Sequence, residues 1–304
     1  MIKQVLQDWK FLSMMTVAII VWAFAFPLIN IALKDLSFIN LTIMRFLVVC
    51  IVSSILIIFQ KKKFSKLHKK DIIPIFLLGF FGVLVYHLGL NYGEQFISPG
   101  AASLIIATIP VLIVILAVIF LKEKITIKKL IGVIIALFGV VIISLYGSEN
   151  AEIEINYIFG AIAVLIAAIM GALYTIAGKK FLERYNGLSL TLYAIILGSI
   201  GLLPFIRPSL FEEIKNMSTE TWISVIFLGV FSTIIGYVIW YTALSKKTAS
   251  EISVFLYAIP VVSTIISYLL LGTMITVFFI IGGLFVISGL IIVNLESRKQ
   301  KKIN

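Results

Sequence analysis

The chain has 304 residues, of which 61% are hydrophobic and 13% charged, with a mean hydropathy of +1.16 and a net charge of +11. Soluble domains average about 45–50% apolar and about 25% charged residues, so these values exclude a soluble protein. The apolar residues form blocks of about the length, roughly 17–25 residues, that a helix needs to cross a bilayer. The blocks predict ten transmembrane helices, over residues 12–33, 38–59, 72–92, 100–121, 130–147, 157–177, 188–206, 221–243, 251–271 and 275–294.

These blocks predict an all-α integral membrane protein with no room for a soluble domain. A membrane β-barrel would show segments of roughly 10 residues that alternate in polarity, whereas these blocks are continuous runs of Ile, Leu, Val and Phe. The single cysteine, Cys50, lies within a span, so no disulfide can form within one chain. The first block is longer than the apolar region of a signal peptide, about 7–15 residues, so we expect it to remain as an anchor.

The basic residues are distributed very unevenly. If the N-terminus is cytoplasmic and the loops alternate, only Lys34, Arg207 and Lys215 of the 25 lysines and arginines fall outside, and Arg45 lies within a span. Since cytoplasmic loops carry an excess of Lys and Arg, both termini are expected in the cytoplasm and the protein in the plasma membrane. The positive charge therefore indicates topology and contact with the lipid bilayer, not nucleic-acid binding. Glu94, which follows the third span, is expected in water outside.

The sequence contains an internal repeat. A shift of 150 residues aligns 78–143 with 228–293 without a gap. The informative matches are Gly79/Gly229, Phe81/Phe231, Pro110/Pro260, Thr126/Thr276, Gly132/Gly282 and Gly139/Gly289. Each repeat, 1–149 and 150–304, holds five spans, and this odd number makes the second copy enter the membrane from the opposite side. Such inverted repeats supply the two mirror-related conformations that alternating access requires; a duplicated scaffold without transport is the alternative.

Several motifs carry a resemblance to a known family. The first span reads AIIVWAFAFPLINIAL around Trp22, Arg45-Phe46 lies near the start of the second, and the fourth leads into LKEKIT around Glu123. The ninth span resembles the fourth through YAIPVVSTIISYLLLGTMIT, although Thr273 replaces the acid. With these motifs the whole chain resembles the EamA-type branch of the drug/metabolite transporter superfamily. The resemblance implies a ten-span carrier of small organic metabolites, such as amino acids, and export more often than uptake.

Ionisable and aromatic residues within the spans are the candidates for a substrate pathway. Trp22 lies about 15 Å into its span, close to the midplane, where an interfacial tryptophan would not lie. His87 and its repeat counterpart Tyr237 are expected on opposite sides of the midplane, without a hydrogen bond to each other. For each residue the alternative is structural: helix packing for Trp22, a backbone carbonyl partner for His87 and an interfacial position for Tyr237.

Further candidates for the pathway are Asn91, which shares a helix face with His87, and Tyr174, Tyr241 and Tyr257. Trp240, near the cytoplasmic end of its span, is expected to be an interfacial anchor.

Two prolines and two charged residues have more specific expected roles. Pro110 and Pro260 lie near the midplane at equivalent positions, so they are predicted to shape a cavity or to act as hinges. Arg45, within snorkelling reach of the surface, would bind an anionic group or hold helix-end carbonyls as a framework residue. Glu251 is either a proton carrier or a solvated acid at a helix N-terminus. His87 is the other candidate proton carrier, because no carboxylate lies near the middle of a span.

The sequence lacks a Walker loop, H-E-x-x-H, G-x-S-x-G and a Cys/His cluster, so no cofactor, metal or built-in ATP hydrolysis is predicted. We therefore predict a secondary transporter that moves a small-molecule substrate by alternating access, as a monomer or a homodimer. The rival interpretation is an intramembrane enzyme or a scaffold.

Overall fold

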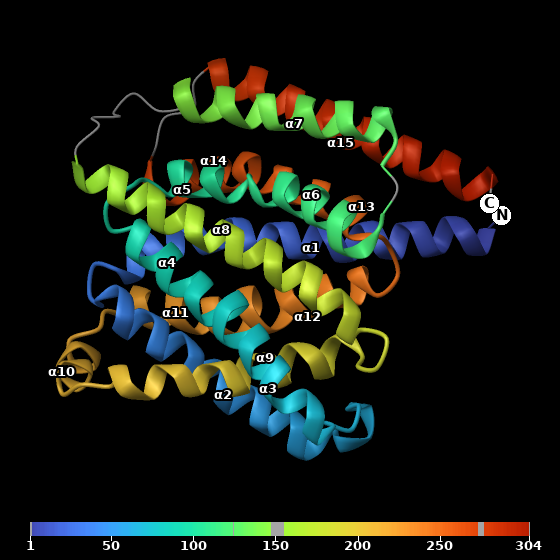
Figure 1. Ribbon diagram of the computed structural model, residues 1–304. Coiled ribbons are helices and arrows are strands. Elements are labelled where there is room, and N and C mark those ends of the chain that lie inside the picture. The colour runs from blue at the N-terminus through green and yellow to red at the C-terminus, as the bar shows by residue number, and fades with distance from the viewer. Residues whose placement is uncertain (1, 124, 147–154, 273–276, 304) are drawn as a thin grey trace.

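The computed structural model describes residues 2–123, 125–146, 155–272 and 277–303, and these are folded as a bundle of helices (Figure 1). Thr273 and Thr276, the repeat counterparts of Glu123 and Thr126, lie outside the described residues. In the first half, the spans are built from α1 (Ile2–Ala32), α2 (Phe38–Phe59), α3–η3–α4 (Ile72–Gly79, Phe80–Val85, Tyr86–Gly93), α5–α6 (Pro99–Ile106, Ile109–Leu121) and α7 (Ile127–Tyr146).

The second half follows the same order with one addition. Its spans are α8 (Ile155–Phe181), α9–η4 (Gly187–Ser199, Ile200–Phe205), α11–η5–α12 (Thr219–Phe227, Leu228–Ile235, Gly236–Leu244), α13–η6–α14 (Ala249–Ser253, Val254–Tyr257, Ala258–Leu271) and α15 (Val277–Ile303). The short helix α10 (Ser209–Lys215), which the hydropathy blocks did not predict, precedes the eighth span.

Within the described residues, eight helices or chains of helices are long and apolar enough to cross a membrane. They begin and end within a few residues of the predicted blocks; the second runs over Phe38–Phe59, as predicted. Two further apolar helices, α7 and α15, lie side by side at one edge of the bundle and complete the ten spans (Figure 1). The protein is therefore an all-helical, multi-pass membrane protein.

Backbone irregularities recur at equivalent places in the two halves. The third and eighth spans each contain a π-helical segment, η3 and η5, and these begin at Phe80 and Leu228. The fourth and ninth spans end at residues in the left-handed conformation, Lys122 (φ 54°) and Gly272 (φ 69°), which are 150 positions apart. The repeat seen in the sequence is thus expressed in the backbone.

Glycines allow the closest helix contacts. A Cβ at Gly139 on α7 would overlap the backbone oxygen of Gly282 on α15, and a Cβ at Gly289 would lie 2.5 Å from the oxygen of Gly132. These are the glycines that matched in the repeat, and small residues at helix interfaces are typical of membrane proteins. At the opposite edge, Gly79 on α3 packs against the backbone of α9 in the same way.

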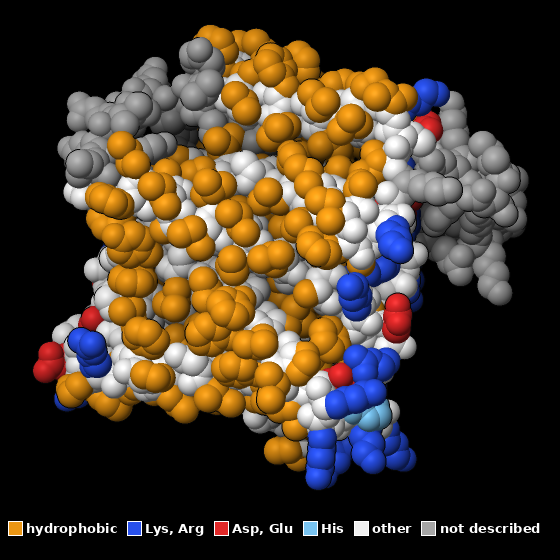
Figure 2. Space-filling view, in the orientation of Figure 1, with side chains coloured by type: hydrophobic (Ala, Val, Ile, Leu, Met, Phe, Trp, Pro, Cys, Tyr) orange, Lys and Arg blue, Asp and Glu red, His pale blue; other side chains and the backbone are white. Residues whose placement is uncertain are grey.

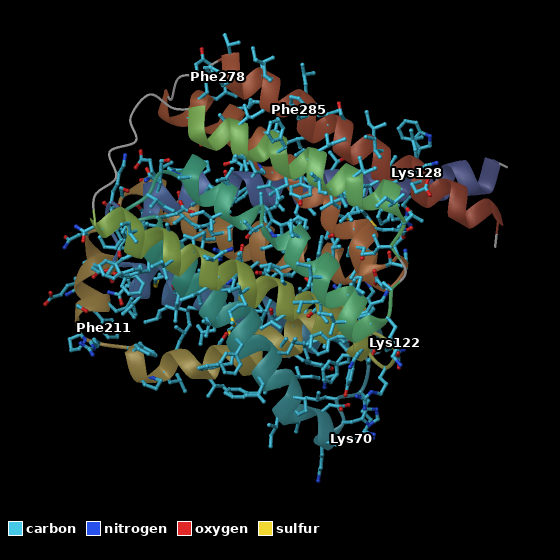
Figure 3. The ribbon with its side chains drawn as sticks, turned by 45° about the horizontal axis from the view of Figure 1, so that its top comes forward. Lys70, Lys122, Lys128, Phe211, Phe278 and Phe285 are labelled. Atoms are coloured by element: carbon cyan, nitrogen blue, oxygen red, sulfur yellow. The ribbon has the colours of Figure 1, made fainter. Side chains whose placement is uncertain are left out.

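The two ends of the bundle differ in charge. Lys and Arg side chains gather at one end (Figure 2), where Lys70, Lys122 and Lys128 lie (Figure 3), and both chain termini lie at this basic end (Figure 1). The other end, here called the far end, carries Asp35 and the helix α10 with Phe211.

Polar contacts join the two halves at each end. At the far end, Asp35 accepts hydrogen bonds from the Ser218 amide (2.8 Å), the Ser218 hydroxyl (2.6 Å) and the Thr221 hydroxyl (2.7 Å) at the start of α11. At the basic end, Asp71 accepts from Tyr185 (2.8 Å) and pairs with Arg184 (3.0 Å).

The Asp35 contact makes stability depend on pH. Hydrogen bonds from the Ser218 and Thr221 side chains lower the pKa of Asp35 below its ordinary value. The stabilisation is therefore present above the pKa of an unfolded aspartate, about 3.9, and is lost as the pH falls through the lower folded pKa. We expect Asp35→Asn to lower the melting temperature in detergent at pH 7, and the difference from wild type to shrink at acid pH. Glu212→Gln, which changes an exposed acid on α10, is the control; an equal deficit at both pH values would contradict this assignment.

Candidate functional site

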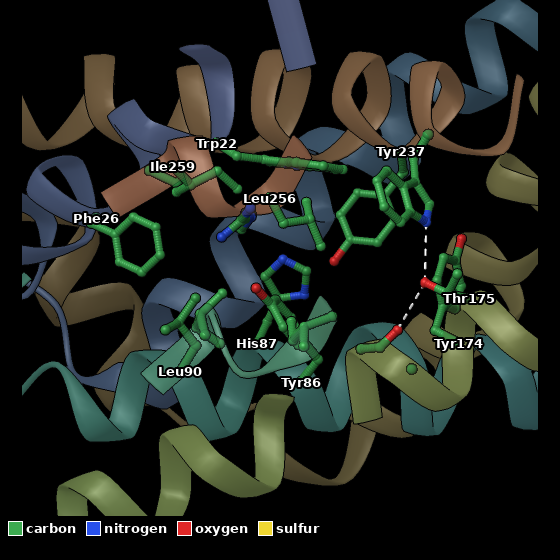
Figure 4. Close-up of a pocket in the computed structure, with 17 residues that line it drawn as sticks. Trp22, Phe26, Tyr86, His87, Leu90, Tyr174, Thr175, Tyr237, Leu256 and Ile259 are labelled. Atoms are coloured by element: carbon green, nitrogen blue, oxygen red, sulfur yellow. Dashed lines mark hydrogen bonds between the residues drawn. The ribbon is translucent and has the colours of Figure 1, made fainter. Parts of the chain in front are cut away.

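A cavity lies in the middle of the bundle, between spans from both halves (Figure 4). Its volume is about 70 Å³, well below the roughly 300–1,000 Å³ of pockets that enclose drug-sized ligands, so in this conformation it is too small for a ligand of that size. Its polar and aromatic lining comprises Trp22, Phe26, Arg45, Tyr86, His87, Tyr174, Thr175, Tyr237 and Trp240; small and aliphatic residues, among them Gly82, Gly171, Leu256 and Ile259, form the remainder.

Trp22 is fixed by reciprocal hydrogen bonds between α1 and η5. Its indole nitrogen donates to the Ser232 carbonyl (2.9 Å), and the Ser232 hydroxyl donates to the Val21 carbonyl (2.8 Å). A Cβ at Gly236 would lie 2.6 Å from the indole nitrogen, so glycine makes room for the ring there. The polar end of Trp22 is thus satisfied by helix packing while its ring faces the cavity.

His87 and Tyr237 come close together in the cavity: their ring centroids lie 6.0 Å apart and both side chains point into it (Figure 4). As expected, no hydrogen bond joins the two side chains among the described residues. Helical side chains lean toward the N-terminus of their helix. The third span begins at the basic end and the eighth at the far end, so both rings lean toward the midplane. The His87 Nδ1–H donates to the Val83 carbonyl (2.6 Å), which leaves Nε2 as the acceptor of the neutral ring.

Trp240 is part of the cavity wall, and its expected position as an interfacial anchor is wrong. It is only 3% exposed, and its indole nitrogen donates to the Thr175 hydroxyl (3.1 Å), which donates to the Gly171 carbonyl (3.1 Å). The Trp240 ring meets Trp22 edge to face at 5.6 Å. Spacing offered a signal for it, since positions 237 and 240 lie on one helix face. Thr175, which follows Tyr174, had no such signal in the sequence.

Arg45 is buried in the cavity wall. It is 2% exposed, so it does not snorkel to the surface, and its Nε donates to the Thr233 hydroxyl (2.8 Å) in η5. Thr233 in turn donates to the Leu228 carbonyl (2.8 Å), five residues back along the π-helical turn. The Nη1 atom of Arg45 is buried without a hydrogen-bond partner among the described residues. One side of the guanidinium is therefore anchored, and another is free for a ligand.

Three predicted candidates lie outside the cavity lining. Asn91 donates to the Thr42 hydroxyl (2.9 Å), and the Tyr241 hydroxyl donates to the Tyr174 carbonyl (3.1 Å), beneath the stacked rings of those two tyrosines. Tyr257 is fully buried in a separate apolar cluster with residues of α7 and α15. In this conformation all three hold helices together.

The prolines lie where the fourth and ninth spans change conformation. Pro110 is in the first turn of α6, directly after the break between α5 and α6. Pro260 is near the start of α14, after the tight turn η6. Ile109 and Ile259, which precede the two prolines, line the cavity, so the breaks place cavity walls; movement at these points remains a prediction.

Glu251 and Glu123 fasten helices at the basic end. Glu251 caps α13 in a reciprocal capping box with Thr248 and lies 3.8 Å from the Lys129 ammonium. Glu123 accepts from the Ala249 amide (2.7 Å) and from the Ser250 hydroxyl (2.6 Å) at the start of the same helix. Glu251 is thus a paired capping residue, and its side chain is 11% exposed instead of solvated.

Glu94 was expected in water outside the membrane, and that expectation is wrong. It is 3% exposed, and neither carboxylate oxygen has a hydrogen-bond partner among the described residues. Nothing in the local sequence distinguishes it from a loop acid, because it lies one residue beyond the span that ends at Gly93. The described residues contain no group of three or more His, Cys, Asp or Glu side chains that could hold a metal ion.

Known proteins resemble this chain in sequence and in architecture. The model of the EamA-like transporter family matches residues 9–145 and again residues 158–295. An uncharacterised transporter of Archaeoglobus fulgidus is 39% identical over 90% of this chain and 94% of its own length. The uncharacterised transporter YdfC of Bacillus subtilis is 32% identical over 93% and 90%, respectively.

Two more distant matches add to this. A protein of Streptantibioticus cattleyicolor named a probable terminal-alkyne amino-acid exporter is 29% identical over 95% of this chain and 94% of its own. A solved crystal structure, 17% identical, covers 96% of this chain and 98% of its own with a TM-score of 0.75, which shows that the fold is shared.

Proposed function

The chain belongs to the EamA-like transporter family, and on that premise we propose that it exports amino acids or closely related compounds by alternating access. The observation that carries the substrate class is Arg45, which is buried in the cavity wall and whose Nη1 has no partner among the residues described. A guanidinium pairs well with a carboxylate. The surrounding rings of Trp22, Tyr237 and Trp240 offer faces for an apolar side chain or an ammonium group.

The small volume of the cavity supports alternating access as the mechanism. A volume of about 70 Å³ leaves little room beyond a few water molecules, so substrate entry requires the surrounding spans to move apart. The breaks before Pro110 and Pro260 are the points at which the fourth and ninth spans would bend. The two halves, related by the repeat, would open the site in turn to either side.

We propose that the protein lies in the plasma membrane with its basic end and both termini in the cytoplasm, since positive charge marks the cytoplasmic side. It would work as a monomer or a homodimer. A reporter that is active only in the cytoplasm is therefore expected to be active when it is fused to the C-terminus. An inactive reporter would contradict this orientation.

The direct test is counterflow in liposomes containing the purified protein. Vesicles are loaded with one unlabelled amino acid at a time, and entry of trace label of the same compound is measured against protein-free vesicles. We expect counterflow for a subset of amino acids, with the label recovered chemically unchanged. Absence of counterflow for the whole panel, or covalent conversion of the label, would reject this function in favour of an enzyme or a scaffold.

A further inference from the structure

Glu94 is a buried carboxyl group without the hydrogen bonds within the described residues that such groups usually make. It follows the last residue of α4 at the far end and is 97% shielded from solvent, yet both oxygens lack a partner in the described part of the chain. Buried carboxylates are normally paired or hydrogen-bonded, because an isolated charge is costly to remove from water. A carboxyl group held in this way is suited to bind a proton in this conformation and a cation in another.

Glu94 lies on the same face of the third span as two other polar residues, one of which lines the cavity. His87, Asn91 and Glu94 are spaced i, i+4 and i+7 along the third span, so they share one face. His87 lines the cavity, and the Oδ1 atom of the fully buried Asn91 has no partner among the described residues. Leu90, one turn before Glu94, also lines the cavity. Glu94 is therefore about 6 Å along the helix axis from a residue of the site.

Arg45 on α2 is the charged group that acts on Glu94. The two side chains make no direct hydrogen bond, since Nη1 of Arg45 and both oxygens of Glu94 have no partner within the described residues. Of the other elements packed on α4, η3 carries no ionisable residue, and α8 meets the adjacent Gly93 with Gly160 and Val164. Burial raises the pKa of the Glu94 carboxyl well above its ordinary value, and Arg45 opposes that shift.

We propose that Glu94 is a shared binding site for a proton and for the ammonium group of the exported amino acid, and that it holds one at a time. Arg45 binds the carboxylate of the substrate, so the pair matches a zwitterion when the cavity opens. A proton on Glu94 neutralises the carboxylate and releases the ammonium group. Each substrate that leaves is then exchanged for one proton that enters, and the conformation described here is the proton-loaded one.

This inference rests on the proposed export of amino acids, and proton release measures it directly. Purified protein in weakly buffered detergent solution receives the amino acid that gave the largest counterflow, while a pH indicator records protons set free. Wild type is expected to release protons, and Glu94→Gln to release none. Glu212→Gln, the same change at an exposed acid of the far end, is expected to behave as wild type. The des-amino analogue of the substrate should release no protons from any variant.

Binding affinity gives a second readout. If a proton and the substrate compete for one carboxylate, the affinity of the wild type for substrate should increase by about tenfold for each unit by which the pH is raised, over the range below the pKa of Glu94. In Glu94→Gln affinity should be weaker and independent of pH. Substrate-linked proton release that persists in Glu94→Gln, or affinity that still follows pH there, overturns the proposal.

Infrared pH-difference spectra separate failure of this inference from failure of the transport function, because they need no substrate. Wild type and Glu212→Gln are expected to show a buried carboxylic-acid band that Glu94→Gln lacks. Absence of that difference overturns the proposal even if counterflow is observed. A band without counterflow by any amino acid would reject the export function and, with it, the ammonium part of the site.

Discussion

Arg45→Met is expected to abolish most transport while leaving the melting temperature of the protein equal to or above that of wild type. The loss follows because Nη1 of Arg45 lies in the cavity wall without a hydrogen-bond partner in the described part of the chain and so can donate to a substrate. A charge-assisted hydrogen bond contributes about 1.5–3 kcal/mol, so counterflow should fall by about 10- to 100-fold. Stability should not fall with it, because burying a guanidinium whose nitrogens are not all hydrogen-bonded costs free energy of desolvation, and a methionine side chain carries no such cost.

Two further variants test whether Arg45 acts on transport and not on stability. Arg45→Lys keeps the charge but lacks the fork that matches a carboxylate, so intermediate counterflow is expected. Arg207→Met changes an exposed arginine at the far end and should alter neither stability nor counterflow. Counterflow at the wild-type level in Arg45→Met would show that the guanidinium does not bind the substrate. A misfolded Arg45→Met protein would show that its role is to hold the framework.

Gly79→Ala is expected to prevent normal packing of α3 against α9. The added Cβ would overlap the backbone oxygen of Ala194, and a Cβ at Gly198 would in turn lie 2.5 Å from the carbonyl carbon of Gly79. Neither contact can be relieved by turning a side chain, so the two backbones must move apart. Overpacking typically costs about 1–3 kcal/mol, and this backbone clash should lie at or beyond the upper end.

The effect should appear as a lower yield of monodisperse protein in detergent and a lower melting temperature. Gly100→Ala is the matched control, because a Cβ there would meet only the Ser98 hydroxyl at 3.9 Å. It also removes a glycine from a helix, so stability should be unchanged or slightly raised. Equal behaviour of the two variants would show that α3 and α9 have room to separate.

Much of the architecture could be predicted from the sequence. The spans followed from apolar block length, as Phe38–Phe59 illustrates, because each span must bury about 20 consecutive residues whatever its neighbours are. The repeat followed from matched residues such as Pro110/Pro260, and the backbone repeats at the same interval in Lys122 and Gly272. The family resemblance, carried by the motifs around Trp22, Arg45 and Glu123, agrees with the family match.

The candidate site could be predicted only in part. Trp22, His87, Tyr174 and Tyr237 were singled out and all line the cavity, whereas Asn91, Tyr241 and Tyr257 do not. Trp240 was assigned to the membrane interface from its depth alone, although its face of the helix turns inward. Depth along a span can be counted from the sequence, but the direction of a side chain depends on how its helix is rotated against its neighbours.

The sequence by itself determined that the protein lies in a membrane, how many spans it has and that they are duplicated. These properties depend on composition and on order along the chain. The tertiary structure decided which polar groups meet. It placed the rings of His87 and Tyr237 6.0 Å apart, although the residues lie 150 positions apart in sequence, and it buried Glu94 near Arg45. The physical reason is that hydropathy is a sum over one segment, whereas a site is formed by contacts between segments. Which side chains meet depends on how the helices cross, on the π-helical turns and on the glycines that let helices pack closely.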